Sequence, residues 1–303
     1  MTENWEPKAQ LPRIEGKVDW ADARLYRSAT MDRKALIFLH IPKTAGTTLN
    51  RIIEWQYSPF EIFTMDPYRI RATPERLKRL SEGRRRGLRM VRGHMFYGVH
   101  QCLPQGATYF TMLRDPVARA LSTYYFILRR PLNPLHRKVK RERLGIEDCI
   151  RLFPQRHNLQ CRLIAGVKDT AITDERTLDM AKEHLTKSFG VVGISERFEE
   201  SLMLMATTFD WEIPFYKNCK VSKTRPQINS GTVEMIRDHN RLDVELYEFG
   251  KGLFEESLQK KEAAVRERLA ALRTLPAPGA LEGFCRSSLG AGRFVVNKIA
   301  SAV

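Results

Sequence analysis

One transition constrains the fold more than any other feature: a short apolar run passes through a small-residue loop directly into a helical pattern. The run is Ala35–Leu39, the loop spans Pro42–Thr47, and apolar side chains then recur at helical spacing from Leu49 to Trp55. A short run of this kind is typical of a strand that is buried on both faces in a parallel sheet. We therefore expect a strand, a tight loop and a helix, in that order.

The rest of the chain repeats this alternation. Further strands are predicted at 88–91, 108–113 and 189–194, and helices at 74–81, 116–128, 196–209 and 232–254, with a mostly helical stretch from 131 to 187. This order predicts an α/β fold, a parallel sheet flanked by helices with a P-loop-like nucleotide site. We divide the chain into a polar leader (1–34), one domain (35–275) and a loosely ordered tail (276–303).

Composition narrows the class of ligand. The chain has 51 Lys and Arg against 35 Asp and Glu, a net charge of +16, which favours an anionic partner. No run approaches the roughly 20 apolar residues of a transmembrane helix, and the N-terminal region lacks the apolar stretch of a secretory signal. The five cysteines are scattered without a C-x-x-C pair, so we expect reduced thiols in a cytoplasmic protein.

The loop after the first strand, HIPKTAGTTL at 40–49, has the chemistry of a phosphate-binding loop. Small residues let a ligand approach the backbone, and the start of the following helix presents N–H groups and a positive dipole. The loop is not a Walker A motif, because its lysine precedes the glycine. The candidate residues are Lys43, Thr44, Ala45, Gly46, Thr47 and Thr48.

A second candidate anion site, RDPVARALSTYYF, begins at the end of another predicted strand. Asp115 can cap the following helix, and Pro116 is suited to its first turn. Arg119 and Ser122 are three residues apart and share a helix face. An arginine with a nearby hydroxyl can bind a second phosphate, and Arg114 and Ser122 are the candidates. Two anion sites at two strand ends of one sheet are a much stronger indication of an anionic ligand than either motif alone.

These two motifs, PKTAGTT (42–48) and RDPxxRxxSxYY (114–125), resemble the cofactor-binding elements of the carbohydrate sulfotransferases that use 3′-phosphoadenosine 5′-phosphosulfate. The resemblance is closest to the heparan-sulfate and uronyl 2-O type and its bacterial relatives. It covers about 35–255, and further pieces follow in the family's order: RGHMFYG (92–98), NLQCRLIAG (158–166), VVGISERFEESL (191–202) and ELYEFGKGLF (245–254).

The resemblance implies roles for the matching residues. The loop from Lys43 to Thr48 would hold the 5′-phosphosulfate, with Lys43 near the bridging oxygen. Arg114 and Ser122 would hold the 3′-phosphate. A loop similar to VSKTRP (221–226) closes over the nucleotide in this family, and its candidate residues here are Lys223, Thr224 and Arg225.

His94 falls where the family places its catalytic base. A neutral imidazole suits a base that deprotonates a hydroxyl, and Lys43 can stabilise charge on the departing phosphate oxygen. Neither role calls for a metal, and the sequence has no cluster of metal ligands. Some relatives carry a second histidine where this chain has Arg92, so it stays open whether His94 acts alone. His100 is the rival candidate for the base.

We therefore expect a sulfotransferase that acts on a carbohydrate or glycoconjugate acceptor, and no nucleic-acid partner. Basic residues at 84–92 and 129–143 are candidates for guiding an anionic acceptor. One alternative is a nucleotide-dependent phosphotransferase. The other is a non-catalytic polyanion-binding protein, which would not need Lys43, Ser122 and His94 at these positions. The acceptor and the oligomeric state stay open.

Overall fold

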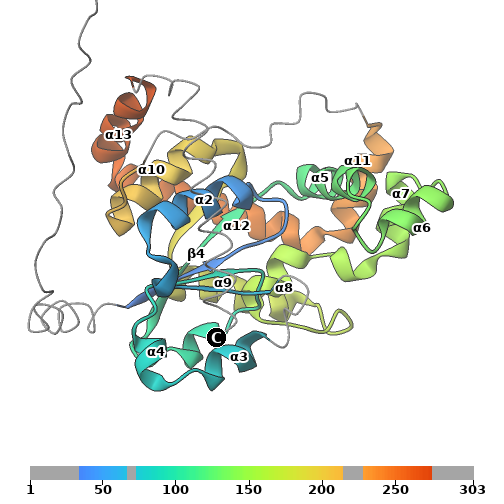
Figure 1. Cartoon of the computed structure of the whole chain (residues 1–303). Helices are drawn as coiled ribbons and strands as arrows, with labels where there is room; N and C mark the ends of the chain where they lie inside the picture. Colours follow the sequence, from blue (N-terminus) through green and yellow to red (C-terminus); the bar gives the residue numbers. More distant parts are fainter. Residues whose placement is uncertain (1–33, 67–72, 214–227, 275–303) are drawn as a thin grey trace, which may run out of the picture. The chain divides into compact units, whose positions relative to one another are not determined.

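The computed structural model describes residues 34–66, 73–213 and 228–274 (Figure 1). The predicted leader (1–34) and tail (276–303) fall almost entirely outside these residues. The same is true of three predicted cofactor-binding residues, Lys223, Thr224 and Arg225.

The five strands in the described residues pair in parallel in one sheet, in the order β2-β3-β1-β4-β5. The strands are β1 (Ala35–Leu39), β2 (Ile62–Thr64), β3 (Met90–Gly93), β4 (Ala107–Leu113) and β5 (Phe189–Ile194). The residues of β1 and β4 are almost all buried, as expected for central strands covered on both faces. The predicted α/β fold is confirmed, with one strand (β2) that the sequence did not reveal and β3 displaced by two residues from the predicted 88–91.

Helices flank this sheet, and α10 and α12 pack directly on β5. A second group, α5, α6, α7 and α11, gathers at the right of Figure 1 around a smaller core of Ile127, Val139, Cys149 and Phe153. The helices are α2 (Gly46–Gln56), α3 (Thr73–Arg79), α4 (Glu82–Arg86), α5 (Pro116–Arg129), α6 (His136–Arg141), α7 (Ile146–Leu152), α8 (Leu159–Ala165), α9 (Glu175–Ser188), α10 (Phe198–Phe209), α11 (Ser230–His239), α12 (Arg241–Lys260) and α13 (Glu262–Thr274), with short 3-10 turns at Pro59–Glu61, Val99–Cys102, Pro154–Arg156 and Ser195–Arg197.

Two helix predictions were wrong in detail. The predicted helix at 232–254 is two helices that meet at Asn240, whose side-chain amide donates to the Ile236 carbonyl at 2.8 Å. A side chain that competes in this way for main-chain partners favours a break. The predicted apolar face of the first helix included Trp55, but this side chain is 47% exposed. The buried face of α2 is formed by Leu49, Ile52 and Ile53, and Trp55 lies outside it.

Candidate active site

The carboxyl ends of three neighbouring strands bring the predicted residues together. His40 directly follows β1, His94 directly follows β3, and Arg114 directly follows β4. The His40 N–H donates to the Gly93 carbonyl at 3.0 Å, which extends the β1–β3 pairing into the site. In an open parallel sheet this edge is where ligands bind.

The loop between β1 and α2 has an unusual backbone. Lys43 and Ala45 both adopt positive φ angles, of 75° and 60°. Alternation with left-handed residues turns successive N–H groups toward one side and makes a concavity that suits an anion. Ala45 is the N-cap of α2, and no side chain caps this helix. Gly46 is required, because a Cβ there would overlap the His40 imidazole. This backbone fits the predicted phosphate-binding loop.

The hydroxyls of this loop are placed differently from one another. Thr44 is fully buried, and its hydroxyl donates to the Ile41 carbonyl at 2.9 Å. The Thr44 side chain therefore stabilises the conformation of the loop. Thr47 is exposed at the start of α2, and Thr48 is buried beside it.

His94 is held in one tautomer. Its Nδ1 lies 2.7 Å from the His40 carbonyl oxygen, and a carbonyl only accepts, so Nδ1 carries the proton. The neutral ring then has its lone pair on Nε2. Burial lowers the pKa of His94 below its ordinary value, and the hydrogen bond to His40 opposes this shift. The His94 ring is therefore neutral near pH 7, and its centre lies 4.4 Å from the centre of the His40 ring.

Arg114 joins the two predicted motifs. Its Nη1 donates to the Lys43 carbonyl at 2.8 Å, across 71 residues of sequence. Its Nε lies 3.7 Å from a Glu196 carboxylate oxygen, and Tyr247 donates to the other oxygen of that carboxylate at 3.1 Å. The first motif and the second therefore form one site.

Helix α5 turns one face to the loop. Asp115 caps it by accepting from the Ala118 N–H at 2.8 Å, as predicted. The Lys43 ammonium lies 4.2 Å from the centre of the Phe126 ring. Ser122 precedes Phe126 by one helical turn and shares its face. The Ser122 hydroxyl makes no hydrogen bond to a residue that the structure describes.

Arg119 is one of the buried residues of α5. It is 3% exposed, and its Nη2 lies 3.3 Å from a carboxylate oxygen of the fully buried Asp243. Asp243 holds the Arg119 guanidinium in the interior, so Arg119 does not extend the predicted anion site of Arg114 and Ser122.

The rival base His100 lies at the opposite edge of the sheet. Its Nδ1 is 3.1 Å from the Tyr109 hydroxyl, and it lines a pocket of about 250 Å³ with the first residues of β4 and β5. Strands rise by about 3.3 Å per residue, so the length of β4 separates His100 from Arg114 and its neighbours.

Arg92 is buried, and its side chain contacts α2. It is 3% exposed and lies 2.6 Å from a Glu54 carboxylate oxygen, and it also donates to the Asn50 carbonyl at 2.9 Å. The prediction that Arg92 belongs to a guiding basic surface was wrong. Arg92 therefore links β3 to α2 through its contacts with Glu54 and Asn50.

Exchange of Arg92 for methionine is expected to lower the free energy of unfolding by about 3–5 kcal/mol, because the Glu54 carboxylate would lose its buried counter-charge. Chemical denaturation measures this loss. The double variant Arg92→Met/Glu54→Leu should recover most of the stability, since both charges are then absent. A single variant as stable as the wild type would contradict this structural role.

The predicted basic stretch at 129–143 is exposed. It comprises Arg129, Arg130, Arg137, Lys138, Lys140, Arg141 and Arg143. Of the other stretch, Arg85 donates to the Cys102 carbonyl at 2.9 Å and Arg86 pairs with Glu82 at 2.7 Å. The stretch at 129–143 is therefore the more available surface for an anion.

Sequence reasoning missed Glu196 and Gln160, which both contact Arg114. Glu196 could have been found from its place just after the predicted strand at 189–194. Gln160 gives no such signal, because it lies on a helix 46 residues away from its partner.

The described parts of the chain lack two features that would indicate other kinds of site. No three or more His, Cys, Asp or Glu side chains gather there in a way that could hold a metal ion. None of the helices in those parts has the length and apolar character that crossing a bilayer requires. Cys102, Cys149 and Cys161 are buried free thiols.

The sequence matches the model of the sulfotransferase family over residues 26–250. Since the match covers well over half of the chain, the protein belongs to this family. The predicted family is thereby confirmed.

Among similar proteins, heparan-sulfate 6-O-sulfotransferase 1 of Homo sapiens is 24% identical over an alignment that covers 84% of this chain and 74% of the relative. Heparan-sulfate 6-O-sulfotransferase 3 of Homo sapiens is 25% identical over 81% of this chain and 63% of the relative. A solved structure, a sulfotransferase from Alicyclobacillus acidocaldarius, aligns with a TM-score of 0.41 and 17% identity over 74% of this chain and 96% of that one. The predicted 2-O subtype is not confirmed, because both curated relatives are named 6-O enzymes.

Proposed function

We propose that this sulfotransferase moves a sulfuryl group from 3′-phosphoadenosine 5′-phosphosulfate to a hydroxyl of a carbohydrate acceptor. Family membership and the names of the curated relatives support this reaction class. The observation that carries the proposal is the 2.8 Å contact between Arg114 and the Lys43 carbonyl. It joins the two segments that are expected to bind the two phosphorylated ends of one nucleotide.

The residues present fit such a donor. The loop from Lys43 to Thr48 would hold the 5′ end, where left-handed Lys43 and Ala45 turn N–H groups toward an anion. Arg114 and the Ser122 hydroxyl would hold the 3′-phosphate. The predicted contribution of Lys223, Thr224 and Arg225 stays a proposal that lies outside the described residues.

When bound, the donor supplies a sulfuryl group on an anionic phosphate leaving group. His94 Nε2 accepts the proton of the acceptor hydroxyl as that oxygen bonds to sulfur. The bond between sulfur and the bridging oxygen breaks, and its electron pair stays with the 5′-phosphate. The Lys43 ammonium stabilises the charge that develops on this oxygen. Electrostatic stabilisation of this kind is expected to make the largest contribution to catalysis of such a displacement.

The acceptor is proposed to be anionic. The exposed basic stretch at 129–143 includes the end of α5 and extends through α6, and a surface of one charge sign raises the local concentration of an opposite charge. The cytoplasmic location also stays a prediction. Transfer of labelled sulfate from the donor to desulfated heparan-type oligosaccharides tests the reaction. Absence of transfer to any carbohydrate, with the donor bound, would overturn the acceptor class.

Exchange of Arg114 for alanine is expected to weaken binding of adenosine 3′,5′-bisphosphate by about 30-fold, because a charge-assisted contact with phosphate is lost. Binding of adenosine 5′-monophosphate should change by less than about threefold. Isothermal titration calorimetry measures both. Arg84→Ala is the matched control, since Arg84 also donates to a main-chain carbonyl, that of Phe60, but lies on α4. Equal losses for both nucleotides would contradict the assignment of Arg114 to the 3′-phosphate.

A further inference from the structure

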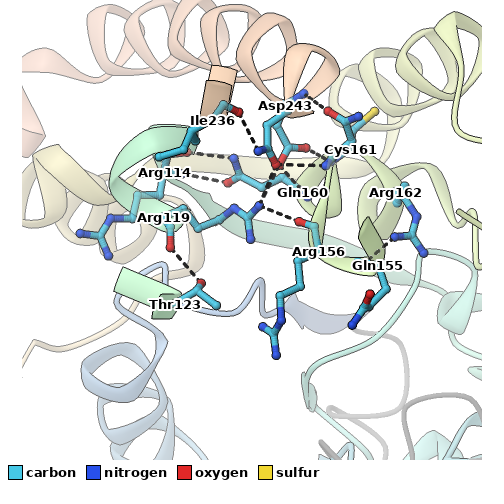
Figure 2. Close-up of polar contacts among 12 residues, drawn as sticks. Arg114, Arg119, Thr123, Gln155, Arg156, Gln160, Cys161, Arg162, Ile236 and Asp243 are labelled. Carbon is cyan, nitrogen blue, oxygen red and sulfur yellow. Dashed lines mark hydrogen bonds and ion pairs between the residues drawn. The ribbon is translucent and has the colours of Figure 1, made fainter. Parts of the chain in front are cut away.

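A buried polar network lies behind Arg114 and links it to two helices (Figure 2). The network includes Gln160 and Asp243, both fully buried, and Arg119. Figure 2 shows Gln160 beside Arg114, whose guanidinium points away from the network. The network is therefore positioned to act on the main chain of Arg114, whose guanidinium contacts Lys43 and Glu196 outside it.

Gln160 holds Arg114 at two points. The Arg114 N–H donates to Gln160 Oε1 at 3.0 Å, and Gln160 Nε2 donates to the Arg114 carbonyl at 2.9 Å. The pairing of β4 with β5 ends one residue earlier, at Leu113 and Ile194. At Arg114 one side-chain amide thus satisfies both main-chain groups, as a neighbouring strand otherwise would.

Asp243 in turn holds Gln160. Asn158, the N-cap of α8, adopts a left-handed conformation, and its side chain does not cap the helix. The Asp243 carboxylate, from α12, instead accepts from the Gln160 N–H at 3.2 Å and the Cys161 N–H at 2.8 Å. A carboxylate at a helix N-terminus is favourable, and the buried Arg119 guanidinium balances its charge. The first turn of α8, and with it Gln160, is fixed from α12.

We propose that Gln160 is a positioning residue for nucleotide binding, which fixes the main chain on both sides of Arg114 so that its guanidinium is held beside the Lys43 carbonyl. This inference rests on the proposed function. The direction of a side chain is set by the main chain that carries it, and a guanidinium binds phosphate well only in a narrow range of geometries. Loss of the Gln160 amide therefore weakens recognition of the 3′-phosphate without removing the charge that performs it.

Exchange of Gln160 for methionine, which has similar volume and no hydrogen-bonding amide, tests this role. The measured quantity is the ratio of the affinities for adenosine 3′,5′-bisphosphate and adenosine 5′-monophosphate, by calorimetry. We expect this ratio to fall by about tenfold, with the affinity for the monophosphate changed by less than about twofold. Gln160→Asn, whose amide is one methylene too short to reach both groups, is a second variant with the same expected result.

Gln105→Met is the matched control. The Gln105 amide also binds main chain, donating to the Arg85 and Leu88 carbonyls at 2.9 Å each, but it lies away from Arg114. The Gln105→Met variant should have a lower melting temperature than the wild type and an unchanged affinity ratio. If Gln160→Met also leaves the ratio unchanged, Gln160 is only structural and the inference fails.

A double variant separates this inference from the proposed function. Arg114→Ala/Gln160→Met should show the same ratio as Arg114→Ala alone, because Gln160 acts through Arg114. A further fall in the double variant would overturn the inference while leaving the role of Arg114 intact. If the wild-type protein itself shows no preference for the 3′-phosphate, the proposed nucleotide site fails, and the positioning role fails with it.

Discussion

Exchange of His94 for alanine is expected to lower kcat by about 10²- to 10⁴-fold, which is the usual contribution of a positioned general base. Binding of adenosine 3′,5′-bisphosphate should stay within about twofold of wild type. The loss of turnover is expected because the His94 Nδ1–H donates to the His40 carbonyl oxygen, with 2.7 Å between nitrogen and oxygen, so Nε2 carries the lone pair that accepts a proton. Steady-state sulfate transfer and calorimetry measure the two quantities on the same preparation.

Two further variants make this test specific. His94→Asn keeps an N–H group that can donate to the His40 carbonyl but has no basic nitrogen, so it should be as inactive as the alanine variant. His100→Ala is the matched control, because His100 is also partly buried but lies with Tyr109 at the other edge of the sheet. It should retain kcat within about twofold. Full activity of His94→Ala together with an inactive His100→Ala would reverse the assignment.

The pH dependence gives an independent readout of the same residue. Burial lowers the pKa of His94 in the free protein, so its neutral, basic form persists to a pH below the ordinary titration range of histidine. The value of kcat/KM should therefore fall only as pH drops through this lowered pKa, and the acidic limb should lie below about pH 6.5. An acidic limb above that value would contradict a neutral, buried base.

The arrangement of strands and loops was predictable because the signals that fix it are local. Runs such as Ala35–Leu39 and Phe189–Ile194 are apolar and buried, and the segments that hold Lys43, His94 and Arg114 each begin where such a strand ends. Parallel strands bring their carboxyl ends to one edge, so Arg114 could be placed near the loop at Lys43 from its position after a strand, whereas the choice of His94 over His100 rests on the family resemblance. The sequence therefore predicts well those features, such as strands and the loops after them, that depend on residues close together in the chain.

The roles of the arginines were not predictable in the same way. Arg92 and Arg119 stand in basic or amphipathic segments and look exposed in sequence, but each is neutralised by a buried carboxylate. Glu54 lies 38 residues from Arg92, and Asp243 lies 124 residues from Arg119. A charge can be buried only with a partner, and the position of a distant partner depends on how the helices pack. Local periodicity cannot supply that information.

Exchange of Lys43 for methionine is expected to lower kcat by about 10²- to 10³-fold, which is the usual effect of removing one group that stabilises developing charge. Affinity for adenosine 3′,5′-bisphosphate should fall by less than about tenfold. Methionine is preferred to glycine, because Lys43 has a φ of 75° and glycine would also change the freedom of the loop. The methionine side chain can still pack on Phe126, where the Lys43 ammonium lies in the structure.

Lys182→Met is the matched control, since Lys182 also lies over an aromatic ring, that of Phe249 at 5.9 Å, but lies on α9. It should leave kcat unchanged within about twofold. The comparison that decides the role of Lys43 is between turnover and binding of the desulfated nucleotide. A charge that acts on the leaving oxygen is needed most in the transition state, so kcat must fall further than affinity. Equal losses in both would make Lys43 a binding residue, because its interaction would then be as strong with the bound product as with the reacting group.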